Sequence, residues 1–120
     1  MYGFGNGIMN EIEVIYLKEA MAFLRSLSES SRNKMVSVIG QVREGNRDPR
    51  LFKKLEGTKI WEFRAEYESN AYRLLAFWDK EERSLVVATH GFSKKTQKTP
   101  KKEVDKAERI RKEYFKSKNR

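Results

Sequence analysis

The segment IWEFRAEY (60–67) alternates apolar and charged side chains, which is typical of a β-strand with one buried face. Its charged face carries Glu62 and Arg64. In the following segment, AYRLLAFWD, Arg73 occupies a mid-strand position that burial would favour for an apolar residue. An arginine fixed on a rigid strand is suited to phosphate, because its planar guanidinium donates several hydrogen bonds at once. The alternative is a structural ion pair with Glu62 or Glu66, and both interpretations stay open here.

A lysine-rich segment, GFSKKTQKTPKK (91–102), is the second feature whose side chains could bind a ligand or take part in a reaction. It holds five lysines and no acidic residue: Lys94, Lys95, Lys98, Lys101 and Lys102. Because repulsion between the lysines costs stability, the segment is either a solvated loop or a contact for an anionic partner. We expect Lys94 and Lys95 to lie at the rim of the face that carries Arg73, together with Lys59.

The distribution of charge points to the same end of the chain. The net charge is +9, and residues 91–120 supply +8 of it, with twelve Lys or Arg against four Asp or Glu. This asymmetry favours an anionic partner, which could be nucleic acid, an anionic membrane or an acidic protein. The plain alternative is a solvated basic helix.

Composition excludes several kinds of site. The chain has no cysteine, so it has no disulfide framework, thiol nucleophile or cysteine-ligated metal. A single histidine makes a histidine-based metal site improbable, and we expect neither a metal nor a cofactor. No apolar stretch approaches the roughly 18–20 residues that a membrane span needs. We therefore expect a cytoplasmic protein without a membrane partner.

The elements that must hold these residues suggest one α+β domain over residues 11–118, after a flexible leader at 1–10. Residues 11–16 suit a first strand. Two helices then follow, each with an apolar stripe at helical spacing. The stripes are Leu17, Ala20, Met21, Leu24 and Leu27 in the first helix, and Met35, Val38, Ile39 and Val42 in the second. We expect an antiparallel helical hairpin on one face of the sheet.

The remainder of the chain predicts a meander and a last helix. After an irregular connection at 45–59, three strands joined by short polar turns make a small, largely antiparallel sheet. Thr99-Pro100 then offers a capping residue and a proline at the first helical position. The predicted order is β-α-α-β-β-β-α.

The ordered set IWEFR, YRLLAFWD and HGFSKKTQKTPKKEVDKA resembles the HigB branch of the RelE/ParE toxin superfamily, the phage-derived toxin-like proteins. The resemblance implies the RelE-like fold and the toxin of a type II toxin–antitoxin system. It implies a metal-independent endoribonuclease that cleaves mRNA on the ribosome, with a HigA-like helix-turn-helix antitoxin as partner. Arg73 matches the arginine that stabilises the scissile phosphate, and Arg64, Lys94 and Lys95 match further basic residues of the site.

The chain departs from the family at the proton-transfer group. Some RelE-type enzymes carry a tyrosine near the C-terminus, and here no tyrosine lies between Phe92 and Tyr114. His90, Glu62 or a lysine of lowered pKa could replace it. Strand alternation alone does not tell which face His90 occupies. We expect Lys98, Lys101 and Lys102 to extend the contact onto ribosomal RNA.

Two other functions fit the same pattern. A ParE-like protein with this fold inhibits DNA gyrase and cleaves nothing, and a module that only binds RNA or DNA would carry the same charge. The fold does not separate these functions, because function lies in the site.

Overall fold

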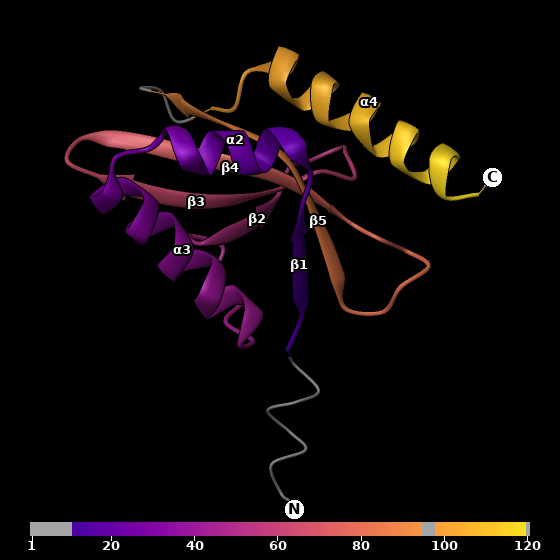
Figure 1. Cartoon of the computed structure of the whole chain (residues 1–120), viewed down its shortest axis with the longest axis horizontal. Coiled ribbons are helices and arrows are strands. Elements are labelled where there is room, and N and C mark those ends of the chain that lie inside the picture. Colours follow the sequence, from indigo (N-terminus) through magenta and orange to yellow (C-terminus); the bar gives the residue numbers. More distant parts are fainter. Residues whose placement is uncertain (1–10, 95–97, 120) are drawn as a thin grey trace, which may run out of the picture.

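The computed structural model describes residues 11–94 and 98–119. Its elements follow the order β-α-α-β-β-β-β-α (Figure 1). The strands are β1 (Glu13–Tyr16), β2 (Phe52–Lys54), β3 (Trp61–Tyr67), β4 (Asn70–Trp78) and β5 (Leu85–Lys94), and the helices are α2 (Lys18–Ser26), α3 (Glu29–Arg43) and α4 (Lys101–Lys118). The expected α+β fold is confirmed with one addition, β2, which lies in the segment expected to be irregular.

The strands form one five-stranded sheet in the order β1-β5-β4-β3-β2. β1 pairs with β5 in parallel, and every other pairing is antiparallel. A two-residue turn joins β3 to β4, with φ values of 48° at Glu68 and 70° at Ser69. Positive φ at both positions matches the twist of such hairpins, although glycine or asparagine adopts it at lower cost.

The helices α2 and α3 cover one face of the sheet. Their buried side chains are those that the apolar stripes predict, including Ala20 and Leu24 in α2 and Met35 and Val42 in α3. α3 begins after Ser28, whose hydroxyl accepts a hydrogen bond from the backbone N–H of Ser31 at 3.2 Å and so caps the helix. Figure 1 shows the two helices diverging from their junction, α2 over β5 and α3 over β3.

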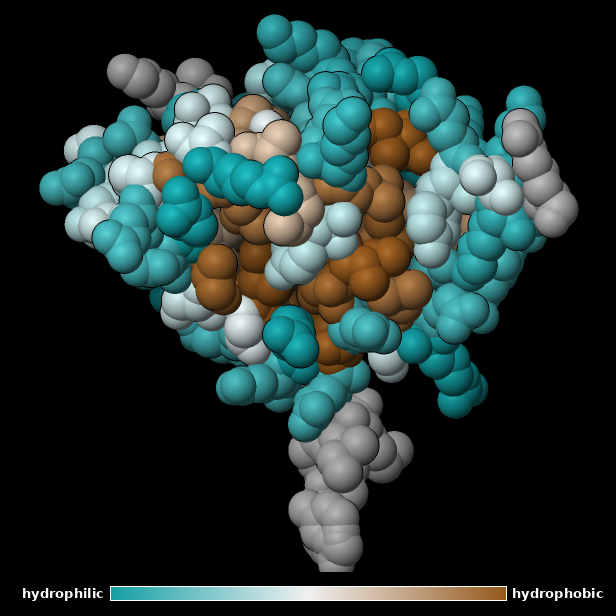
Figure 2. Space-filling view, viewed as in Figure 1, coloured by the Kyte–Doolittle hydropathy of each residue, from teal (hydrophilic) through white to brown (hydrophobic). Residues whose placement is uncertain are grey.

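The packing on this face of the sheet is uneven. Gly91 of β5 lies directly beneath Phe23 of α2, so a Cβ at position 91 would stand 2.3 Å from the phenyl ring. In contrast, the area between the diverging helices is more open. Figure 2 shows apolar side chains gathered there inside a hydrophilic rim, and Tyr16, Trp61 and Trp78 are half-buried members of this layer.

The helix α4 packs on the opposite face, over a second apolar cluster that includes Leu75, Phe77, Ala107 and Phe115. Its C-terminal end is tied to the sheet by Asp79, whose carboxylate accepts hydrogen bonds from Tyr114 at 2.7 Å and Lys118 at 2.6 Å. Burial and the hydrogen bond to Asp79 raise the pKa of Tyr114 to about 12. Tyr114 therefore serves as an anchor of α4.

The start of α4 differs from the expectation. Pro100 occupies the N-cap position, and no side chain caps the helix. The hydroxyl of Thr99 donates to Glu62 on β3 instead of the helix N-terminus. Of the helices in the described residues, none has the length and hydropathy to cross a bilayer.

Candidate functional site

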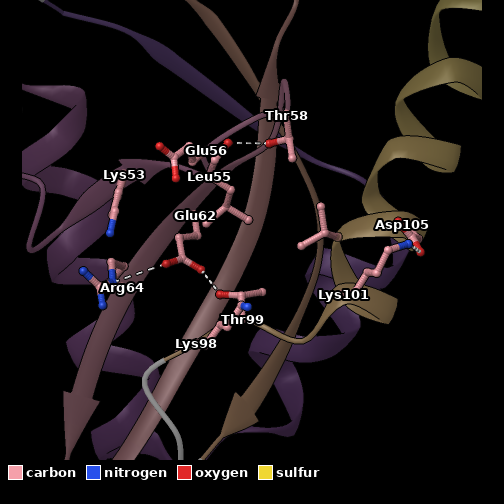
Figure 3. A pocket seen from close by; sticks show the side chains of 11 residues that line it. Lys53, Leu55, Glu56, Thr58, Glu62, Arg64, Lys98, Thr99, Lys101 and Asp105 are labelled. Atoms are coloured by element: carbon pink, nitrogen blue, oxygen red, sulfur yellow. Dashed lines mark hydrogen bonds and ion pairs between the residues drawn. The ribbon is translucent and has the colours of Figure 1, made fainter.

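A cleft opens between the β2–β3 side of the sheet and the first turn of α4, with a volume of about 610 Å³. Figure 3 shows Glu62, Arg64 and Thr99 pointing toward one another in it. Basic and acidic side chains share its walls with a few apolar ones. The lining residues are Lys53, Leu55, Glu56, Thr58, Glu62, Arg64, Lys98, Thr99, Lys101, Val104 and Asp105.

The strand register brings the charged side chains to one face of the sheet. Lys53 of β2 lies opposite Glu62 of β3, and Arg64 of β3 lies opposite Arg73 of β4. Residues paired in this way project to the same side with their Cβ atoms about 4.5–5.5 Å apart. Two arginines directly opposite each other repel, so the pair requires a nearby anion.

Arg73 is the most deeply placed of these groups, with no exposed surface. Its Nη1 donates to the carbonyl oxygen of Tyr72 at 3.0 Å, whereas its Nε and Nη2 have no hydrogen-bond partner among the described residues. Burial, and next the charge of Arg64, lower the pKa of Arg73. Unsatisfied buried nitrogens cost free energy that a bound oxyanion would recover. In this structure other groups cover Arg73, since none of its surface is exposed.

Glu62 supplies the anion that the arginine pair requires. Its Oε2 lies 3.4 Å from Arg64 Nε and 3.8 Å from Arg73 Nε. Its Oε1 accepts a hydrogen bond of 2.5 Å from the Thr99 hydroxyl. Glu62 is only 3% exposed. Its contact with Arg73 is an ion pair, and the distance between the two atoms is longer than that of a hydrogen bond.

Lys94 adds a third cation beside this pair. It ends β5 opposite Ala71 and is 8% exposed, so most of its surface is buried. Burial, followed by the charge of Arg73, lowers the pKa of Lys94. A lysine of lowered pKa is better able to exchange a proton near neutral pH.

His90 lies on the α4 side of the sheet, opposite Leu75. It is 4% exposed, with Nε2 at 3.1 Å from Glu103 Oε1 and Nδ1 at 3.0 Å from Thr89 Oγ1. Burial lowers the pKa of His90, and the hydrogen bond with Glu103 acts in the opposite direction. His90 is not among the residues that line the cleft, and its contacts are those of a clamp between β5 and α4.

The remaining predicted residues divide into three groups. Lys98 and Lys101 line the cleft, and Lys101 pairs with Asp105 at 2.8 Å. Lys59 and Lys102 are exposed and are not among its lining residues. Lys95 lies outside the described residues.

Several residues of the cleft were missed at the level of sequence, and Lys53 and Thr99 are the two that matter most for the site. Lys53 belongs to β2, whose three residues are too few to show an alternating pattern. The only local indication that Lys53 belongs to a strand was its place beside Phe52, which is buried. Thr99 was expected to cap α4, and nothing local in the sequence indicates its contact with Glu62, which is 37 residues away.

Arg64 and the buried carboxylate of Glu62 therefore line the cleft, and two buried cations that are not among its lining residues, Arg73 and Lys94, lie beside them. This excess of positive charge suits an anion with several oxygens, such as a phosphate. Among the described residues, no group of three His, Asp or Glu side chains is placed to hold a metal ion.

Comparison with known proteins places the chain in a family. Residues 22–112 match the model of the phage derived protein Gp49-like family (DUF891). A mutant of the E. coli toxin RelE in its free state has a similar structure, with a TM-score of 0.52 and 20% identity over 68% of this chain and 81% of that one. The toxin–antitoxin complex RelBE2 from Mycobacterium tuberculosis gives a TM-score of 0.43 and 21% identity, covering 70% of this chain and 99% of that one. No match was found among curated protein sequences. The RelE-like fold predicted from the sequence is confirmed.

Proposed function

Since the chain belongs to the phage derived protein Gp49-like family and has a RelE-like fold, we propose that it is the toxin of a type II toxin–antitoxin system and cleaves mRNA on the ribosome. The observation that carries the proposal is Arg73, a buried guanidinium with two nitrogens that have no hydrogen-bond partner in the described residues. Arg64 and Lys94 place further positive charge beside it.

The proposed reaction uses the RNA as its own nucleophile. The 2′-hydroxyl oxygen attacks the adjacent phosphorus, the bond from phosphorus to the 5′-oxygen breaks, and the products are a 2′,3′-cyclic phosphate and a 5′-hydroxyl. Negative charge builds up on the phosphoryl oxygens in the transition state. A preorganised donor at such a position contributes about 3–4 kcal/mol, and Arg73 and Arg64 are the donors in this proposal.

Two protons must move, one from the 2′-hydroxyl and one to the departing 5′-oxygen. We assign the first to Glu62 and the second to Lys94, because both lie beside Arg73 and the pKa of Lys94 is lowered. Proton transfer of this kind typically contributes about 10²–10⁴-fold. We do not assign His90 a proton, because its two ring nitrogens contact Thr89 and Glu103.

The basic surface around the cleft has a separate task in the proposal. Lys53, Lys98 and Lys101 line the entrance, and Lys102 is exposed on the first turn of α4. These lysines would hold the phosphates of mRNA and ribosomal RNA without taking part in the reaction. Each such contact should add about 0.7–0.9 to the slope of log affinity against log salt.

The partner that restrains the toxin would be a HigA-like helix-turn-helix antitoxin. An acidic segment would neutralise the basic cleft, and an apolar one would pack on the half-exposed layer between α2 and α3 shown in Figure 2. Co-expression with the neighbouring antitoxin gene should restore growth. If the purified complex cleaves mRNA on ribosomes as fast as the free toxin, this account of inhibition fails.

The function is tested by adding purified protein to a reconstituted translation reaction and mapping the mRNA ends. Wild type should produce new ends within translated codons, and Arg73→Ala should not. Arg83→Ala is the matched control, because Arg83 is exposed in the turn between β4 and β5. Thermal unfolding of each variant separates loss of the site from loss of the fold.

Two outcomes would replace the proposal. Inhibition of DNA supercoiling by gyrase without mRNA cleavage would assign the ParE-like function. Tight nucleic-acid binding without either activity would leave a binding module.

A further inference from the structure

Thr99 is the one hydroxyl residue of the cleft that contacts the carboxylate between the arginines, in the described residues. We propose that Thr99 is a positioning residue: its hydroxyl fixes Glu62 so that Glu62 holds Arg64 and Arg73 in register for the substrate phosphate. This inference rests on the proposed function, because it assigns Thr99 a part in the same site.

The hydrogen bond itself supports the assignment. Thr99 Oγ1 lies 2.5 Å from Glu62 Oε1, the length of a strong charge-assisted hydrogen bond between a hydroxyl and a carboxylate. Both residues are buried, at 9% exposure for Thr99 and 3% for Glu62. Water therefore competes weakly for either group, and the hydroxyl controls the orientation of the carboxylate.

That orientation determines which edge of each guanidinium is occupied. With Oε1 engaged by Thr99, Oε2 faces the Nε atoms of Arg64 and Arg73 at 3.4 and 3.8 Å. Glu62 therefore lies against the Nε edge of both groups. On Arg73, Nη2 stays without a partner in the described residues and is the atom that we assign to the phosphate.

The backbone next to Thr99 is restricted in conformation, and this fixes the direction in which its hydroxyl points. The next residue, Pro100, has φ fixed at −60°, and a proline also restricts the conformation of the residue before it. α4 begins immediately afterwards at Lys101, and the contact between Glu103 and His90 at 3.1 Å holds its first turn on β5. Because Thr99 does not cap α4, removal of its hydroxyl should leave the helix start intact.

The experiment compares Thr99→Val, which keeps the shape and removes the hydroxyl, with Thr99→Ser, which keeps the hydroxyl. Single-turnover mRNA cleavage on ribosomes is measured over a range of ribosome concentrations. We expect the maximal rate of Thr99→Val to fall about 10–100-fold with half-saturation unchanged, since a shift of about 1 Å in a positioning group can cost about 10²-fold. Thr99→Ser should retain most of the wild-type rate.

A second measurement does not depend on cleavage. In ¹H–¹⁵N spectra of the arginine side chains, the Nε–H signal of Arg73 should move in Thr99→Val and keep its position in Thr99→Ser. Titration with inorganic phosphate should shift this signal in wild type at lower concentrations than in Thr99→Val. If wild type does not cleave mRNA but these signals behave as described, the proposed function fails and the positioning role stands.

The inference is overturned if the Arg73 Nε–H signal is the same in Thr99→Val and wild type. It is also overturned if Thr99→Val cleaves at the wild-type rate, or if it loses ribosome affinity without a change in maximal rate. Failure of Thr99→Ser to restore either quantity would show that the methyl group, and not the hydroxyl, is what the site needs.

Discussion

Replacing Glu62 with glutamine should destabilise the protein and strengthen its binding of anions at the same time. The substitution keeps an oxygen that can accept from Thr99, but it removes the negative charge between Arg64 and Arg73. Three cations, those two and Lys94, then share a largely buried space. Stability falls because the repulsion is no longer offset, and anion affinity rises because an incoming phosphate no longer meets a carboxylate.

The size of the loss follows from the distances. At an effective dielectric constant of about 20, the attractions of Glu62 to Arg64 at 3.4 Å and to Arg73 at 3.8 Å are each about 4–5 kcal/mol. Desolvation of the carboxylate offsets several kcal/mol of this sum. Removing one partner of a buried pair typically costs about 3–5 kcal/mol. Arg64 can turn toward water, since its side chain is 20% exposed, so we expect the lower end, about 3 kcal/mol.

The assay is urea unfolding followed by tryptophan fluorescence, together with calorimetric titration with inorganic phosphate. A loss of about 3 kcal/mol corresponds to a fall of roughly 10 °C in the melting temperature of a domain of this size. Glu66→Gln is the matched control, because Glu66 is on the same strand face but exposed, and its loss should cost less than about 1 kcal/mol. The reasoning is refuted if the two variants are equally stable, or if Glu62→Gln binds phosphate no better than wild type.

Three further predictions concern the fold around the site. Gly91→Ala should cost about 1–3 kcal/mol in urea unfolding, because the new Cβ would stand 2.3 Å from the Phe23 ring, and Phe23→Ala should relieve most of that cost; equal losses in both backgrounds would contradict the contact. Burial lowers the pKa of His90 from 6.5, with Glu103 partly opposing it, so the unfolded chain binds the proton more readily. The contribution of neutral His90 to the free energy of unfolding is therefore fully present above pH 6.5 and is lost as the pH falls below it. Between pH 7 and pH 5.5 the free energy of unfolding should fall more for wild type than for His90→Gln. Ser69→Gly should stabilise the fold by up to about 1 kcal/mol and so raise the melting temperature, because glycine adopts the φ of 70° without steric cost. An unchanged or lower melting temperature would show that the serine fits this turn.

The fold followed from the sequence wherever a pattern was long enough to show its period. Phe63 and Ala65 are buried and Glu66 is exposed, as the alternation in β3 predicts. The three residues of β2 give no such pattern, and tertiary pairing with β3 decides that they form a strand. The parallel pairing of β1 was equally hidden, since nothing in a short strand indicates its partner.

The candidate site was predictable as a set of charges on one face but not as a geometry. Alternation places Glu62 and Arg64 together, and the register adds Arg73. The side of His90 was not predictable, because a register shift between Leu75 and Ala76 interrupts the pairing of β4 with β5. Local pattern also gives no means of telling which lysine of a basic segment is buried, and Lys94 is.

The pairing of β1 with β5 also determines when the sheet can be completed during synthesis. Glu13 meets Leu85 across the sheet, so β1, the first of the described strands, has no partner until the three strands β2, β3 and β4 and then β5 have been made. Contacts between residues so distant in sequence form slowly, and an unpaired edge strand is prone to join other chains in the meantime. Lys94 and Thr99 leave the ribosome later still. A chain released before β5 is made would therefore carry Arg64 and Arg73 without Lys94 and Thr99 beside them, and its β1 would have no strand to pair with.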